Sequence, residues 1–184
     1  MNSKSIKNLI LSALFLSMGI LLPMIFGQIQ IIGKTLLPMH IPVFLCAFIC
    51  GWKYGLTVGF FLPIVRSLLF AMPPMYPTAV ATALEMATYG IVAGLMYHRL
   101  IKRPLLSLYL SLAISMIAGR LIRTLAELLL LNLSGNTFVL NTFFTGTILV
   151  GIPGIILQFI LIPAIILLLN KLNFQKTHDT HKNI

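Results

Sequence analysis

The sequence predicts an all-α integral membrane protein, a six-transmembrane-helix bundle with both termini cytoplasmic. Two observations on composition support the membrane class: 59 % of the 184 residues are hydrophobic and only 9 % are charged. Soluble domains are about 45–50 % apolar and about 25 % charged, so this composition excludes a water-soluble globule. As a third observation, the apolar residues form runs whose lengths are close to the roughly 20 residues that a spanning helix needs.

A single six-helix membrane domain is expected over residues 1–184. The predicted spans are 6–26, 38–51, 55–71, 78–97, 105–131 and 142–170, followed by a polar, frayed tail over 171–184. The first run follows Lys4 and Lys7 as a signal peptide would, but no small-residue cleavage site comes after it, so it is interpreted as a retained helix. The second span is short and contains proline, so a tilted or irregular segment is expected there.

The basic residues set the orientation of these spans. With the N-terminus inside, nine lysines and arginines lie in the inner segments, whereas the outer loops contain only Lys34. This bias predicts that both termini face the cytoplasm. Most of the basic residues that give the net charge of +10 are the ones that set this orientation. They lie at the ends of apolar runs and not on one solvated face. Nucleic-acid binding is therefore disfavoured.

Five ionisable residues lie inside the predicted spans: Arg66, Glu85, Arg120, Arg123 and Glu127. Such a charge costs about 2.5–3.5 kcal/mol at mid-bilayer, so each is expected to face a partner or a wet cavity, here in the outer half of the membrane. Three arginines against two glutamates leave one positive charge, which a ligand carboxylate in an outward-facing pocket would balance. The alternative is a purely structural set, with Arg123 paired to Glu127 and Glu85 paired to Arg66 or Arg120.

The segment "MPPMYP", residues 72–77, joins the spans that carry Arg66 and Glu85. Proline cannot continue a helix, so this segment is predicted to be a stiff connector above the proposed pocket. Met72, Met75 and Tyr76 are then expected to cover a small ligand with apolar and aromatic surface. The alternative is a hairpin that only reverses the chain.

Neither catalytic residues nor metal ligands are predicted. The sequence has no H-E-x-x-H, no G-x-S-x-G and no phosphate-binding loop, so no cofactor is expected in this chain. Cys46 and Cys50 lack the further ligands of a metal site. His40 and Gln158 are polar residues within spans and are included as candidate substrate contacts. Small residues of the first span, Ala13 and Ser17, are predicted either to dock a partner helix or to pack internally.

Several of these segments together resemble a known family. The run "LLPMHIPVFLCAFICGWKYGLTVGFFLPIVRSLLFAMPPMYPTAVATALEMATYGIVAGLMY", with "IAGRLIR" and "GIPGIILQFILIPAI", is similar to substrate-binding (S) subunits of energy-coupling factor (ECF) vitamin transporters, over about residues 8–170. The resemblance implies a six-helix bundle in a bacterial plasma membrane that binds a vitamin or precursor from outside. It also implies a transmembrane coupling subunit, two cytoplasmic ATPase subunits that use ATP, and import by toppling of the S subunit.

The resemblance also implies a docking motif and a substrate. In such subunits a small-residue motif on the first helix meets the coupling subunit, and Ala13 and Ser17 match that motif in part. Within the family the sequence is most similar to the pantothenate group, with the pyridoxine-related group close behind. The carboxylate of pantothenate suits the surplus arginine, whereas pyridoxine has none. The alternatives from another class are an intramembrane enzyme and a structural membrane protein.

Overall fold

The computed structural model describes residues 3–26, 38–99, 104–133 and 151–182, and all secondary structure in these ranges is helical. The elements are α1 (Ser3–Phe26), α3 (His40–Cys50), α4 (Trp52–Phe70), the π-helix η1 (Met75–Ala79), α5 (Val80–Arg99), α6 (Pro104–Leu133) and α8 (Ile152–Lys182). Among the described residues, five helices are long and apolar enough to cross a membrane, and the shorter α3 is a further apolar helix, whereas six spans were predicted. The predicted start of the sixth span, 142–151, lies almost wholly outside the described residues.

Helix α3 is short, as predicted, and helix α8 extends beyond its predicted span. Helix α3 has 11 residues, a length of about 16 Å, which is shorter than the hydrocarbon core of about 30 Å. All of its residues except Ile49 are buried, so the expected second span is a short helix enclosed by its neighbours. Helix α8 continues to Lys182, so the backbone is helical where a frayed tail from residue 171 was predicted. Extending an existing helix adds one hydrogen bond for each residue fixed, without a new nucleation step.

The breaks between helices have local causes. Gly51 separates α3 from α4 with φ of 97°, a conformation that residues with a Cβ rarely adopt. Helix α4 ends at Ala71, which is left-handed and donates its N–H to the carbonyl of Ser67 at 2.9 Å. Pro73 and Pro74 follow directly and cannot continue the helix. The chain then enters η1 and α5 in the opposite direction, as both the stiff connector and the simple hairpin predict.

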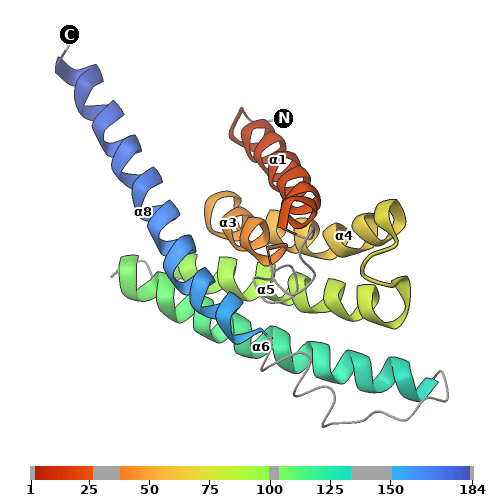
Figure 1. Ribbon diagram of the computed structural model, residues 1–184. Coiled ribbons are helices and arrows are strands. Elements are labelled where there is room, and N and C mark those ends of the chain that lie inside the picture. Colours follow the sequence, from red (N-terminus) through yellow and green to blue (C-terminus); the bar gives the residue numbers. More distant parts are fainter. Residues whose placement is uncertain (1–2, 27–37, 100–103, 134–150, 183–184) are drawn as a thin grey trace.

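Helices α4 and α5 form a close antiparallel pair through glycine. A Cβ added at Gly90 would lie 2.2 Å from the carbonyl carbon of Gly55, and one added at Gly59 would lie 2.3 Å from the carbonyl oxygen of Met86. Small residues allow this approach of two backbones, which is a main source of helix association in lipid. Figure 1 shows α5 between α4 and α6, in agreement with its extensive contacts to both.

Replacing Gly90 by alanine is expected to destabilise the protein by about 1–3 kcal/mol, because the new methyl group overpacks a backbone contact. The sign of the change in the free energy of unfolding is diagnostic, since replacing glycine by alanine at an uncrowded helix position stabilises a protein by about 0.5–1 kcal/mol. Equilibrium unfolding in detergent micelles measures the difference. Thr57→Ala, on the exposed side of α4, is the control and should leave stability nearly unchanged. A more stable Gly90→Ala variant would show that α4 and α5 are not in backbone contact.

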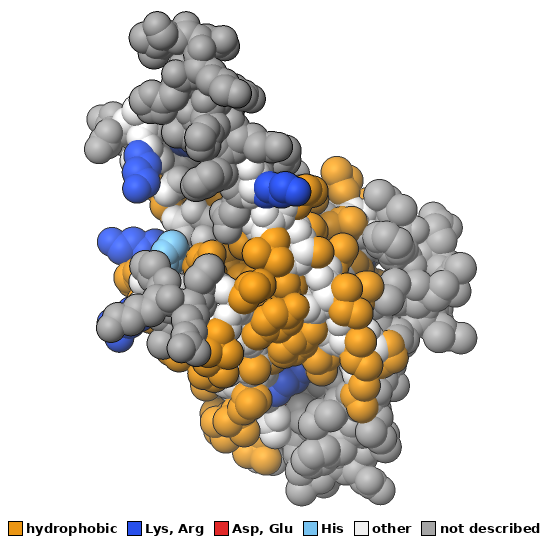
Figure 2. Space-filling view, turned by 90° about the vertical axis from the view of Figure 1, so that its left-hand side faces the viewer, with side chains coloured by type: hydrophobic (Ala, Val, Ile, Leu, Met, Phe, Trp, Pro, Cys, Tyr) orange, Lys and Arg blue, Asp and Glu red, His pale blue; other side chains and the backbone are white. Residues whose placement is uncertain are grey.

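The interior and the surface of the bundle are both apolar. The largest fully buried side chains include Phe44, Leu62, Met86, Tyr89 and Ile162. At the same time many leucines and isoleucines are exposed, among them Leu68 and Ile117. Figure 2 shows apolar side chains over much of the described surface of one face, with several basic side chains and no acidic one. An apolar surface of this extent is expected for helices that face lipid.

Candidate functional site

The structure brings four of the five predicted intramembrane charges together between α5 and α6. Glu85 Oε2 lies 2.9 Å from Arg123 Nη1, and Glu85 Oε1 lies 3.4 Å from Arg120 Nε. Arg123 Nε also pairs with Glu127 Oε1 at 3.0 Å, one helical turn further along α6. The Glu85 side chain is 0 % exposed, so its charge is stabilised by partners within the protein and not by water.

Tyr89 completes the surroundings of Glu85. Its hydroxyl donates a hydrogen bond to Glu85 Oε1, four residues earlier on α5. The ring of Tyr89 lies against Gly119 of α6, where an added Cβ would clash, and this close approach brings Arg123 within reach of Glu85. Sequence reasoning missed Tyr89, although the spacing of four places it on the same helix face as Glu85.

Two glutamates and two arginines make this network electrically neutral, which leaves Arg66 on α4. Within the described part of the chain no carboxylate pairs with Arg66, and its Nε is buried without a hydrogen-bond partner. The register of the α4–α5 contacts places Arg66 level with Ala79. It therefore lies about 9 Å nearer the Pro-rich turn than Glu85 does. The next residue, Ser67, also has a buried side-chain oxygen without a partner.

The Pro-rich turn lies at the end of the molecule where α4 and α6 end (Figure 1). Met72, Met75 and Tyr76 are all exposed there. The hydroxyl of Tyr76 donates to the carbonyl of Leu130, so the turn is bonded to the last part of α6. Whether the two methionines cover a ligand stays a prediction.

His40 and Gln158 are both buried in the interior. The His40 ring lies 5.4 Å from the ring of Tyr89, which connects it to the surroundings of Glu85. Gln158, on α8, is 1 % exposed, and its Nε2 has no hydrogen-bond partner among the described residues. An amide donor buried without a partner costs about 1–3 kcal/mol, so Gln158 is suited to bind a polar group that enters from outside the chain.

The small residues of α1 divide between two faces. Ala13 and Ser17 are exposed, and the Ser17 hydroxyl bonds only back to the Ala13 carbonyl at 3.0 Å. Ser12 and Gly19 point inward, and Gly19 lies against Leu62 of α4. The described residues therefore do not use Ala13 and Ser17 for internal packing, and the pair presents a small-residue surface toward lipid or a partner.

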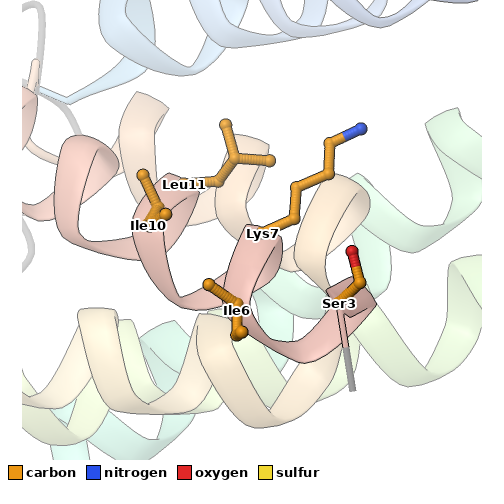
Figure 3. A pocket seen from close by; sticks show the side chains of 5 residues that line it. All are labelled: Ser3, Ile6, Lys7, Ile10 and Leu11. Carbon is orange, nitrogen blue, oxygen red and sulfur yellow. The ribbon is translucent and has the colours of Figure 1, made fainter. Parts of the chain in front are cut away.

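An open cavity of about 510 Å³ lies along the N-terminal half of α1, far in sequence from Arg66 (Figure 3). Its lining residues are Ser3, Ile6, Lys7, Ile10 and Leu11. Sequence reasoning expected a pocket beside Arg66 and did not predict this one. The predicted pocket beside Arg66 stays a prediction.

Together, the lipid-facing helices, the buried ion-pair network and the unbalanced cation define a polytopic membrane protein suited to binding a polar solute. The family model described as ECF transporter, substrate-specific component, matches residues 7–166. The chain belongs to this family, whose members are transport subunits, not enzymes, and work with an ECF module and a small-molecule substrate. No curated protein and no solved structure matches the chain.

Proposed function

We propose that this chain captures an anionic, water-soluble vitamin or vitamin precursor, with pantothenate as the first candidate. The observation that supports an anionic substrate is the charge balance: Glu85 and Glu127 offset Arg120 and Arg123, and Arg66 has no counter-charge among the described residues. A half-buried guanidinium binds a carboxylate through two parallel hydrogen bonds, which is the strongest pairing open to it.

The other groups of pantothenate suit the remaining candidate contacts. Its hydroxyls and amide can bond to the amide of Gln158 and the imidazole of His40, both of which are buried. Arg120 makes the longest of the three ion pairs and is the second proposed contact for the carboxylate. Pyridoxine lacks a carboxylate and would leave Arg66 unbalanced, so it is the weaker candidate.

The proposed orientation places this site toward the outside of the cell. Nine lysines and arginines on one side against Lys34 on the other favour cytoplasmic termini in a bacterial plasma membrane. In that orientation Arg66 and the turn with Met72, Met75 and Tyr76 lie in the outer half of the membrane. The vitamin would then enter from outside, with the turn as part of its cover.

The proposed partners supply the energy for import. A transmembrane coupling subunit would contact α1 at Ala13 and Ser17, where small side chains allow close approach of a second helix. Two cytoplasmic ATPase subunits would hydrolyse ATP, since no phosphate-binding loop is found in this sequence.

Replacing Arg66 by alanine is expected to weaken pantothenate binding about ten- to a hundredfold. The change removes a charge-assisted contact worth about 1.5–3 kcal/mol. Arg66→Lys keeps the charge but not the two-point geometry, so an intermediate affinity is expected. Titration calorimetry on the purified protein, with wild type first compared across the B vitamins, measures these affinities.

Arg99→Ala is the matched control, because Arg99 is an exposed arginine at the far end of α5. It should bind as wild type does. If Arg66→Ala and Arg120→Ala both fold and bind with unchanged affinity, the assignment of the site is wrong. If wild type binds pyridoxine and no carboxylate-bearing vitamin, the substrate class is wrong.

A further inference from the structure

The cavity along α1 has one polar end and one apolar side. Figure 3 shows the ammonium of Lys7 and the hydroxyl of Ser3 at one end of the row of lining residues, and Ile10 and Leu11 at the other. Ile6 and Ile10 are both exposed and lie on one helix face, since they are four residues apart. At about 510 Å³ the cavity is large enough for a bulky group, and it is open to the surroundings.

Lys7 is exposed, and none of the described carboxylates pairs with it. Of the three acidic residues in the sequence, Asp179 has a side chain outside the described residues. Glu85 and Glu127 are both engaged by the arginines between α5 and α6, so neither is available to α1. Lys4 is exposed one turn before Lys7 and adds a second positive charge near the same end.

We propose that this cavity binds one anionic phospholipid, with its phosphate at Lys7 and Ser3 and an acyl chain along Ile6 and Ile10. Phosphate suits the lysine ammonium and the serine hydroxyl, which are both hydrogen-bond donors. Hydrocarbon suits the isoleucines, which are exposed on a helix that crosses the membrane. Basic side chains near a membrane surface attract anionic headgroups in this way, and the residues that line this cavity all belong to α1. The site is separate from Arg66, but Ile6 and Ile10 lie on the same face of α1 as Ala13 and Ser17, so the lipid is proposed for the chain without its coupling subunit.

The test measures phosphatidylglycerol bound to the full-length protein in detergent by native mass spectrometry. Wild type is expected to retain one phosphatidylglycerol in preference to phosphatidylcholine. Lys7→Gln should raise the lipid concentration for half occupancy about fivefold, as expected for one basic residue near a membrane surface. Ile10→Trp, at a position that is 63 % exposed, should also reduce retention by filling the apolar side of the cavity.

Lys53→Gln is the control, because Lys53 lies over the Trp52 ring and does not line the cavity. Equal losses in Lys7→Gln and Lys53→Gln would overturn the proposal in favour of general surface attraction. Equal retention of phosphatidylcholine by wild type would exclude headgroup recognition. Displacement of the lipid by millimolar inorganic phosphate would show that the cavity binds a soluble anion instead. The phosphatidylcholine and inorganic phosphate measurements use wild type alone, so their outcome does not depend on whether the variants fold.

Discussion

Replacing Glu85 by alanine is expected to destabilise the folded protein by about 3–5 kcal/mol, the cost of breaking a buried ion pair by removing one partner. Glu85 is 0 % exposed and is the shared partner of Arg120 and Arg123, so its loss leaves buried positive charge uncompensated. Tyr89 loses its acceptor in the same step. Equilibrium unfolding of wild type and variant in mixed detergent micelles measures the difference.

Glu127→Ala is the matched control for this prediction. Glu127 is 13 % exposed and pairs only with Arg123 among the ion pairs described, and Arg123 keeps Glu85 when Glu127 is removed. The loss should therefore be clearly smaller than for Glu85→Ala. Glu85→Gln preserves the shape of the side chain but not its charge, and should fall between the two. Equal stabilities of all three variants and wild type would show that the network does not hold α5 to α6.

Replacing Ala13 by tryptophan is expected to abolish transport and assembly with the coupling subunit while leaving vitamin binding by the isolated subunit near normal. A bulky side chain prevents the close approach of a second helix. Ala13 is exposed, so the change should not disturb the interior of this chain. Co-purification with the partner subunits, uptake by cells and titration calorimetry measure the three properties separately.

Ile117→Trp is the control for this experiment, since Ile117 is an exposed residue of α6 and also receives a tryptophan. It should assemble, transport and bind as wild type does. Loss of binding together with assembly in Ala13→Trp would mean that Ala13 packs internally. Normal transport in Ala13→Trp would place the docking surface on another helix.

Much of the helical content could be predicted because a helix that faces lipid needs a long run of apolar residues, and such runs are visible in the sequence. Long apolar runs give α1, α4, α5 and α6 within a few residues of their ends, apart from the η1 turn. The position of Arg123 and Glu127 on one helix face follows from a spacing of four in the sequence. The surplus of one arginine over the glutamates follows from counting alone.

Which charged side chains form ion pairs between helices could not be predicted. Sequence reasoning left Glu85 to pair with Arg66 or Arg120, and the structure pairs it with Arg120 and Arg123. That choice depends on the register of α5 against α6, which the contact between Tyr89 and Gly119 sets. The short length of α3 was predicted, but its enclosure by other helices was not, because an apolar run does not reveal whether lipid or protein surrounds it.

The contacts on the two sides of α5 have a mechanical consequence. Sliding α4 along α5 by a single residue would bring Cβ atoms to the places where Gly55 and Gly90 meet. Sliding α6 along α5 would pull Arg123 away from Glu85. We expect both displacements to be steeply opposed, so that the three helices move as one rigid body. Any reorientation during a transport cycle would then carry α4, α5 and α6 together, or be confined to α1, α3 and α8 around them.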